Sequence, residues 1–327
     1  MWKVPLFDLN FDGRESQAVT SVLESRWLTS GQKTGEFEKK FAAYLGEGVQ
    51  CCAVSSCTAA LHMSLLVCGI KEDDEVIVSG LTFVAAVNVI SMVKATPVLA
   101  DSKSFDDWNV NPLDIEKKIT SKTKAIIIVH YAGYPCDMDE ILRISKKHNL
   151  ILIEDVAHAV GAEYKGQKCG TFGDISCFSF FSNKNLSTGE GGMFVTRDKK
   201  IDKDARLLRS HGMTSMTVER HEGKIISYDV LRPGLNYRID EIRSAIGLVQ
   251  LEKLDAGNQK RRMLVKKYHE CLEGITGLVI PWREESQTRT SSYHIFTVLL
   301  PVNIERKEVI AKLQGKGIQT SIHYPAI

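Results

Sequence analysis

A lysine near the middle of the chain lies in an unusual setting. Lys184 follows the aromatic run 177–181 and precedes the glycine-rich turn 189–192. Burial beside such a run lowers the pKa of an ammonium group and makes the amine nucleophilic at neutral pH. Such an amine can form a Schiff base with an aldehyde. The alternative interpretation is an ordinary loop lysine beside a glycine hairpin.

Two acids and a histidine follow another apolar run, 150–153. They are Glu154, Asp155 and His158. Open α/β sheets bind their ligands at the carboxyl ends of their strands, and a carboxylate buried there must be paired. Asp155 is therefore a candidate ligand-binding acid. The alternatives are that Asp155 caps a helix or pairs with a basic side chain, and that His158 is a satisfied core histidine.

Two further features would suit a flat, phosphorylated ligand. Ser56, Cys57 and Thr58 lie at a junction where a strand leads into a helix, and the free N–H groups of a first helical turn bind phosphate. Phe83 opens another helical stretch and could stack on a heteroaromatic ring. An ordinary helix cap and a core phenylalanine are the alternatives.

Taken together, these residues match the requirements of pyridoxal phosphate. Its aldehyde needs a lysine, its pyridine nitrogen needs an acid that keeps it protonated, and its phosphate needs hydroxyls and helix N–H groups. Lys184, Asp155 and the 56–58 segment would supply these groups.

Short apolar runs that alternate with helical patterns must position these side chains. Such alternation predicts parallel strands buried on both faces and joined by helices, that is, an α/β core. The expected strands are Val49 to Val54, Glu75 to Val78, Pro97 to Ala100, Lys124 to His130 and Leu150 to Ile153, and the expected helices are Thr58 to Cys68 with Thr58 as cap, Phe83 to Val93 and Met138 to His148.

The pattern changes towards the end of the chain. We expect a large domain over residues 1–250 and a smaller α+β domain over 251–327, and about two domains is also what 327 residues predict at roughly 150 residues per domain. The expected elements of this part are a helix over Asp240 to Leu254 and on towards Glu273, a strand over Tyr293 to Leu300, a helix over Ile304 to Gln314 and a strand over Gln319 to Tyr324.

Composition excludes several classes of protein. A formal net charge of +2 is too balanced for an electrostatic nucleic-acid binder. No apolar run approaches the roughly 18 residues of a membrane span, and Asp8, Asp12 and Glu15 interrupt any signal peptide. The eight cysteines contain no C-x-x-C pair, so we expect no metal site and reduced thiols in a cytoplasmic protein.

Eight segments resemble the DegT/DnrJ/EryC1/StrS family, and they occur in the family's order from about residue 5 to the end of the chain. They are Trp27 to Gly31, Ser56 to His62, Thr82 to Ala85, Gly133 to Met138, Glu154 to His158, Lys184 to Gly192, Arg209 to Met213 and Gly234 to Arg238. A match of this breadth is specific for the family, but it gives little information about the individual substrate.

The resemblance implies a fold and an activity. The fold is that of a fold-type-I transferase, with a mostly parallel seven-stranded sheet flanked by helices and a smaller α+β C-terminal domain. The activity is pyridoxal-phosphate-dependent transfer of an amino group, from L-glutamate, to a keto group of a nucleotide-linked deoxysugar for polysaccharide or antibiotic-sugar biosynthesis. The partners are that sugar, the amino donor and a second copy in a homodimer with shared sites.

The resemblance also implies roles for individual residues. Lys184 would bind the cofactor's aldehyde and move the substrate's proton, and Asp155 would bind the pyridine nitrogen. The other implied cofactor contacts are Phe83 on the ring face, His158 near O3′, Ser56, Cys57, Thr58 and Ser179 at the phosphate, and Asn236 at the phosphate of the neighbouring subunit's cofactor. The candidate sugar contacts are Lys33, Arg209, His211, Arg238 and His323.

Two departures from the family pattern stand out. Cys57 occupies a position where many members have glycine, and family members continue beyond residues 323–327, so we expect an incomplete small domain. Two alternatives to an aminotransferase follow from the resemblance. A dehydratase branch replaces the lysine with histidine, which Lys184 argues against, and a regulatory or binding member without catalysis remains open. Whether C3 or C4 of the sugar is aminated also remains open.

Overall fold

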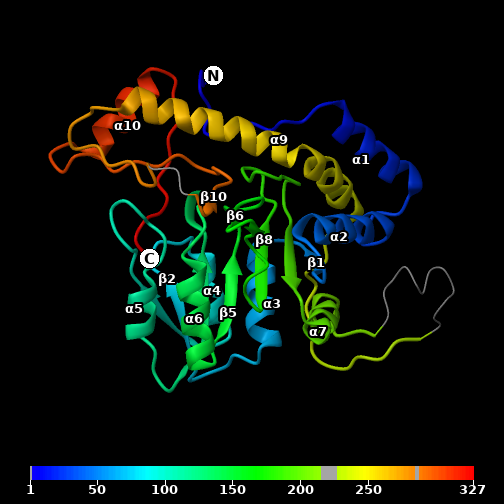
Figure 1. Ribbon diagram of the computed structural model, residues 1–327. Coiled ribbons are helices and arrows are strands. Elements are labelled where there is room, and N and C mark those ends of the chain that lie inside the picture. The colour runs from blue at the N-terminus through cyan, green and yellow to red at the C-terminus, as the bar shows by residue number, and fades with distance from the viewer. Residues whose placement is uncertain (1, 215–226, 284–286) are drawn as a thin grey trace.

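A seven-stranded sheet forms the centre of the computed structural model, which describes residues 2–214, 227–283 and 287–327 (Figure 1). Its strands are β1 (Gln50–Val54), β2 (Glu75–Ser79), β3 (Thr96–Ala100), β4 (Thr123–Val129), β5 (Ile151–Asp155), β8 (Ile175–Ser179) and β9 (Gly192–Thr196). They pair in the order β1-β9-β8-β5-β4-β2-β3. Both ladders of β9 are antiparallel and the other four are parallel, so the expected mostly parallel seven-stranded sheet is confirmed.

Helices cover both faces of the sheet. The helices of the described residues are α1 (Gly13–Ser25), α2 (Gln32–Leu45), α3 (Cys57–Val67), α4 (Ala85–Met92), α5 (Pro112–Lys117), α6 (Met138–His148), α7 (Lys199–Arg209), α9 (Glu241–Leu272) and α10 (Arg306–Gly315), of which α1, α9 and α10 lie beyond the end of the sheet (Figure 1). Strand β4 shows how the two faces arise, because successive side chains of a strand point to opposite sides. Ala125 and Ile127 pack in the core that contains α3 and α4, whereas Ile126 and Ile128 pack in the core of α6.

The long helix α9 lies across the molecule and links the sheet domain to the C-terminal part of the chain (Figure 1). It packs against α1 and α2, and Lys253 forms an ion pair with the buried Glu15 of α1 at 2.5 Å. Glu241, its first residue, accepts hydrogen bonds from the N–H groups of Gly31, Lys33 and Thr34 at the start of α2. The domain division at 250/251 remains a prediction, and α9 runs across that position without a break.

Most expected elements of the sheet domain are confirmed to within a few residues. One cap is wrong: Ser56, not Thr58, caps α3, because its hydroxyl accepts the N–H of Ala59 at 3.1 Å. The two expected strands in the C-terminal part are also wrong. The segment Tyr293 to Leu300 makes only an isolated bridge between Val279 and Leu299, and Gln319 to Tyr324 is irregular.

A second, three-stranded sheet lies beside the C-terminal part. It consists of β10 (Arg289–Thr290), β6 (Glu163–Tyr164) and β7 (Gln167–Lys168), in that order and with antiparallel pairing. It joins the 289–290 segment to the loop that follows β5. Residues 291–296 are thereby brought to the carboxyl edge of the main sheet, where Ser292 N–H donates to Gly133 O at 3.1 Å.

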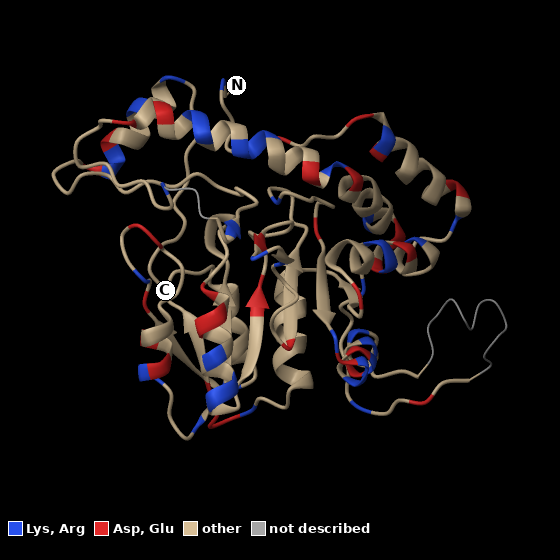
Figure 2. Ribbon diagram, viewed as in Figure 1, with Lys and Arg blue, Asp and Glu red and all other residues tan. Residues whose placement is uncertain are grey.

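Charged residues lie mainly on the helices, and the strands of the central sheet carry few of them (Figure 2). All eight cysteines are free thiols, and six of them are buried. Within the described ranges, no helix combines the length and the apolar character that a membrane crossing would require.

Candidate active site

The candidate residues gather at the carboxyl edge of the parallel strands, where open α/β sheets bind their ligands. The carboxyl end of β5 points towards α9 (Figure 1). This strand ends with Glu154 and Asp155, and Figure 2 shows its tip in the colour of acidic residues. Ser179 is the last residue of β8, and the 55–58 segment follows β1. Residues from three separate parts of the sequence therefore lie at one edge because of sheet topology alone.

Lys184 is presented by a compact connection between β8 and β9. Phe180 N–H donates to Gly191 O at 2.9 Å, and Thr188 N–H donates to Phe180 O at 2.8 Å, so the connection is closed at its base. Leu186 is completely buried in the core with α2 and anchors the middle of the connection. The lysine is thus held by a folded loop that joins two antiparallel neighbours, as the interpretation of a loop lysine in a hairpin expects, and its catalytic role remains a prediction.

The amine of Lys184 sits in a desolvated environment. Burial lowers the pKa of Lys184 to about 8, although the charges of Asp155 and Cys57 act in the opposite direction. A substantial fraction of the amine is therefore neutral near pH 7–8, which is the form that attacks a carbonyl carbon.

Asp155 is almost fully buried at the end of β5, with 6% of its surface exposed. Its Oδ1 accepts the N–H of Ala157 at 2.9 Å and the thiol of Cys57 at 3.8 Å. Burial raises the pKa of Asp155, against the effects of the Ala157 N–H and the Lys184 charge. A buried carboxylate without a cationic partner is stabilised when a cationic N–H group binds to it, because that bond offsets the free-energy cost of burying the charge.

His158 follows β5 and is fixed on both sides of its ring. Its Nδ1 accepts the N–H of Ala132 at 3.2 Å, so its hydrogen is on Nε2 and is directed at the hydroxyl of Tyr324, 2.7 Å away. Burial lowers the pKa of His158 well below its ordinary value and keeps the ring neutral. This is a satisfied histidine, but one that lies beside Tyr324 and His323 at the candidate site, with ring centroids 6.0 and 6.4 Å away.

Phe83 precedes α4 and is 56% exposed, which excludes the interpretation as a core phenylalanine. Its ring lies 5.7 Å from the ring of Tyr324, centroid to centroid. An exposed aromatic face at this edge of the sheet is available to stack on a flat ligand.

The start of α3 offers free N–H groups. The first hydrogen bond within the helix runs from Ala60 N–H to Ser56 O at 3.2 Å, and Ser56 Oγ takes the N–H of Ala59. The N–H groups of Cys57 and Thr58 precede these bonds, so helix geometry gives them no acceptor inside the helix. Gly192 of β9 lies directly against this turn, since a Cβ placed there would be 2.4 Å from the Ser56 carbonyl carbon and 2.6 Å from Cys57 N.

The segment 236–238 runs beside this helix start. Ser55 N–H donates to Tyr237 O at 2.8 Å, and Arg238 forms a bridge with Val54. Asn236 is exposed and forms a bridge with Ser210. The segment is therefore near the candidate phosphate site of its own chain, while the expected reach of Asn236 into a neighbouring subunit remains a prediction.

The remaining predicted sugar contacts have different positions. The structure corrects the expectation for Arg209: its guanidinium is 2% exposed and donates to Glu38 Oε1 at 2.7 Å and to Ala53 O at 2.8 Å. Bound in this way beneath α2, Arg209 has no surface with which to contact a sugar. Lys33 pairs with Glu36 at 3.2 Å in the first turn of α2, and His211 is exposed just after α7.

Three functional candidates were missed by sequence reasoning. His294 Nε2 lies 3.4 Å from Lys184 Nζ, Asn185 Oδ1 lies 3.0 Å from His294 Nδ1, and Tyr324 contacts His158 as described above. His294 ends the polar stretch 283–294 and directly precedes the apolar run 295–300, and this pattern by itself does not mark a functional residue.

Pyridoxal phosphate fits the residues that the structure brings together. The donor set consists of a desolvated amine, a buried carboxylate, an exposed aromatic face and two helix N–H groups, supplied by Lys184, Asp155, Phe83 and residues 57–58. These groups match the aldehyde, the ring nitrogen, the ring face and the phosphate of that cofactor, respectively. Among the described residues, no cluster of three or more metal-ligating side chains accompanies them.

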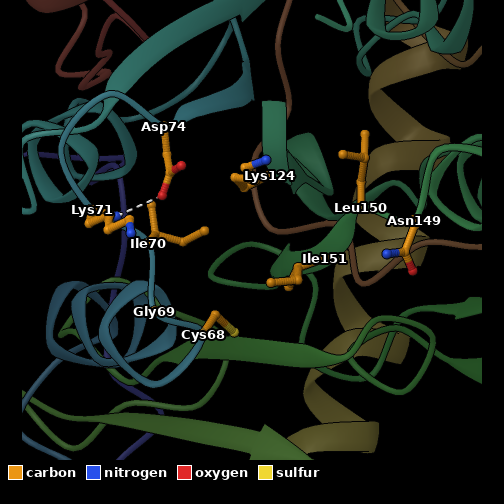
Figure 3. A pocket seen from close by; sticks show the side chains of 9 residues that line it. All are labelled: Cys68, Gly69, Ile70, Lys71, Asp74, Lys124, Asn149, Leu150 and Ile151. Atoms are coloured by element: carbon orange, nitrogen blue, oxygen red, sulfur yellow. Dashed lines mark hydrogen bonds between the residues drawn. The ribbon is translucent and has the colours of Figure 1, made fainter. Parts of the chain in front are cut away.

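A separate pocket of about 400 Å³ lies at the opposite edge of the sheet (Figure 3). Figure 3 shows Lys71 and Asp74 on one side, joined by a hydrogen bond from Lys71 N–H at 3.0 Å, and Lys124, Leu150 and Ile151 on the other. These residues lie at the amino ends of β2, β4 and β5. None of the predicted site residues lines this pocket, so it is distinct from the candidate active site.

Comparisons with known proteins agree with this geometry. The model of the DegT/DnrJ/EryC1/StrS aminotransferase family matches residues 10–327. GDP-perosamine synthase of Escherichia coli O157:H7 is 40% identical over 325 residues, covering 98% of this chain and 85% of that protein. DesV of S. venezuelae, solved in complex with a ketimine intermediate, superposes with a TM-score of 0.90 at 33% identity, covering 99% of this chain and 84% of DesV. Spr1654 of Streptococcus pneumoniae, solved in its PLP form, gives a TM-score of 0.90 at 30% identity, covering 99% of this chain and 85% of Spr1654.

Proposed function

The chain belongs to the DegT/DnrJ/EryC1/StrS aminotransferase family of pyridoxal-phosphate-dependent enzymes that act on sugars, and from that premise we propose a specific reaction for it. The proposed reaction moves an amino group from L-glutamate to a keto group of a nucleotide-linked deoxysugar. The 40% identity to GDP-perosamine synthase supports a nucleotide sugar as the acceptor.

One observation carries the proposal. The pKa of Lys184 is lowered to about 8 by burial, in a loop that faces a buried carboxylate and the start of a helix. A structural lysine in such a place would be expected to pair with an acid at short distance. Instead, Lys184 Nζ contacts the imidazole of His294 at 3.4 Å, which leaves its N–H and lone-pair capacity available for chemistry.

The cofactor, when bound, would supply an aldehyde that condenses with amines and a ring that accepts the electron pair of a breaking C–H bond. The chain's own residues would do the rest. Asp155 would hold a proton on the ring nitrogen, the Cys57 and Thr58 N–H groups would bind the phosphate with Ser56 and Ser179 beside them, and Phe83 would cover a ring face. The amine of Lys184 takes a proton from one carbon and returns it to another, as its pKa near neutrality permits.

His158 and Tyr324 complete the proposed site. The Nε2–H of His158 donates to the Tyr324 hydroxyl oxygen at 2.7 Å, which leaves the hydroxyl hydrogen free to donate to a polar atom of a ligand. His323, Arg238, His211 and Lys33 remain proposed contacts of the sugar or its diphosphate. Arg209 is removed from that set by its buried bond to Glu38.

Borohydride trapping tests the proposal. Apo-protein incubated with pyridoxal phosphate, reduced and digested should carry the phosphopyridoxyl group on the peptide that contains Lys184. Lys184→Ala should keep its fold and lose this label, whereas Lys165→Ala, an exposed loop lysine paired with Asp139, should keep it. Label absent from Lys184 in the wild type would refute the assignment.

A panel of nucleotide keto sugars then identifies the acceptor. The enzyme is first loaded with an amine by glutamate, and each sugar is scored by its ability to restore the aldehyde form of the cofactor. A non-catalytic regulatory or binding member of the family would bind the cofactor and respond to none of the sugars. The homodimer with shared sites and the cytoplasmic location remain predictions, and light scattering of the holoenzyme tests the first.

A further inference from the structure

A histidine far away in the sequence faces the amine of Lys184. His294 belongs to the segment that follows β10, is 110 residues from Lys184, and places its Nε2 3.4 Å from Lys184 Nζ. A ring nitrogen can donate or accept, and which of these it does depends on where the ring's hydrogen sits. The surrounding hydrogen bonds decide that question.

The chain of bonds begins at α9. The side-chain amide of Asn258 donates through Nδ2 to Val160 O at 3.1 Å, and its Oδ1 accepts from Arg261 Nη1 at 3.3 Å. These two bonds fix the orientation of the Asn258 amide. Asn185 Nδ2 then donates to Asn258 Oδ1 and to Ser292 O, each at 2.8 Å. Both hydrogens of the Asn185 amide are thereby used on acceptors that cannot donate.

The oxygen of Asn185 must therefore accept. Its Oδ1 lies 3.0 Å from His294 Nδ1, so the hydrogen of the neutral imidazole is on Nδ1. The lone pair of the ring is consequently on Nε2 and points at Lys184 Nζ. Burial and the nearby Lys184 charge lower the pKa of His294 well below its ordinary value, which keeps the ring in this neutral form.

Other charged and titratable groups around the pair have different partners. Asp155 accepts from Ala157 and from the thiol of Cys57. Both ring nitrogens of His158, whose ring centroid is 4.5 Å from that of His294, are engaged by Ala132 and Tyr324. Two other groups interact with the pair through their charges. The charge of Lys184 lowers the pKa of His323, and the charge of Arg261 lowers the pKa of His294.

We propose that His294 is a positioning residue for Lys184: its Nε2 accepts an N–H of the ε-amine whenever the lysine is not joined to the cofactor. A neutral amine that donates one N–H to His294 is held in place and keeps its lone pair free for attack. In the ammonium form the same contact stabilises the proton that the lysine carries. This inference rests on the proposed function, because it assigns His294 to the step in which Lys184 acts.

A matched pair of variants separates the acceptor from the packing. His294→Gln and His294→Met have side chains of equal length and similar volume, and both lose the ring N–H that Asn185 accepts. Only the glutamine retains an oxygen that can accept from Lys184. Because the glutamine amide can also donate to Asn185, the difference between the variants reports the polar contacts of residue 294 apart from its packing. The shift in the titration midpoint of Lys184 then reports the acceptor that faces the amine.

The measurement is the pH dependence of pyridoxal phosphate condensation with the apo-protein, followed by absorbance and mapped by borohydride reduction. A hydrogen-bond acceptor favours the charged form of an amine, so its loss lowers the titration midpoint. We expect His294→Met to lower the midpoint by about one pH unit and the rate for the neutral amine by about tenfold. His294→Gln should stay close to the wild type in both.

The outcomes distinguish this inference from the proposed function. No label on Lys184 in the wild type defeats both. Label in the wild type together with equal midpoints and rates in the two variants, whether shifted or not, overturns the role of His294 and leaves the aminotransferase proposal standing. A lowered midpoint and slower condensation in the methionine variant alone support the role.

Discussion

Replacement of Glu154 by glutamine should destabilise the protein strongly, although the change removes no atoms from the core. Glu154 is completely buried next to Asp155. It accepts five hydrogen bonds: Oε1 from the N–H groups of Phe172 and Gly173 and the hydroxyl of Ser176, and Oε2 from Gly170 N–H and His130 Nε2. It therefore joins the end of β5 to the loop 170–173.

The magnitude follows from counting donors. A glutamine has one accepting oxygen, so an NH₂ group must face either the Oε1 donors or the Oε2 donors. His130 cannot turn into an acceptor, because its Nδ1 already accepts Cys136 N–H at 3.0 Å and its hydrogen is on Nε2. At least two buried donors lose their acceptor in either orientation. At about 1–3 kcal/mol each, the cost is about 2–6 kcal/mol, out of a typical total free energy of unfolding of about 5–15 kcal/mol.

The effect should depend on pH in one direction. Burial by itself raises the pKa of Glu154, but the bond from His130 and the N–H groups of Gly173 and Gly170 outweigh burial and leave the pKa below the ordinary 4.5. A carboxylate with a lowered pKa contributes its stabilisation fully above pH 4.5 and loses it as pH falls through the folded-state pKa. The gap between wild type and Glu154→Gln should therefore be constant near pH 7 and narrow below about pH 4.5.

The assay is urea unfolding followed by circular dichroism at several pH values. Glu140→Gln is the matched control, since that carboxylate is half exposed and pairs with Arg143 at 2.9 Å, and its loss should cost less than about 0.5 kcal/mol. A cost below about 1 kcal/mol for Glu154→Gln at pH 7, or a gap that widens in acid, would refute the reasoning.

Two further predictions concern packing at the site. Gly192→Ala brings a Cβ to 2.4 Å from the backbone of Ser56, so we expect the free energy of unfolding to fall by about 1–3 kcal/mol. A fluorescence titration should also show weaker pyridoxal phosphate binding. The control is Gly35→Ala in α2, where a Cβ has nothing within 4 Å and the change should be neutral or stabilising. Arg209→Met removes one of the two arginines that pair with Glu38, while Arg206 still pairs with it at 2.7 Å, so we expect a loss of about 1.5–3 kcal/mol in urea unfolding. The KM for the sugar should stay within about twofold, and a large rise in KM would restore Arg209 as a sugar contact.

Much of the site was predictable from local sequence, because the carboxyl ends of parallel strands converge on one edge of a sheet. The apolar runs located β1 and β5, and Ser56 after β1, Asp155 at the end of β5 and His158 after β5 lie where that rule places them. The same reasoning failed for residues 293–300, because an apolar alternation becomes a strand only when a partner strand is present. There the chain makes only the isolated bridge of Leu299 to Val279.

Side-chain roles that depend on distant contacts could not be predicted. Arg209 lies in a motif that suggests a ligand contact, yet α2 brings Glu38 against it and buries the guanidinium. The sequence pattern predicts that His294 belongs to a strand. In the structure, the small sheet of β6, β7 and β10 brings it next to Lys184, which is 110 residues away in the sequence.

The amino-acid sequence by itself determined the alternation of strands and helices, the family and the identity of the candidate lysine and acid. All of these depend on near neighbours in the chain or on the order of short motifs. Only the tertiary structure decided the pKa of Lys184, the tautomer of His294 and the burial of Arg209, since each depends on which side chains from other elements exclude water and supply hydrogen bonds at that point.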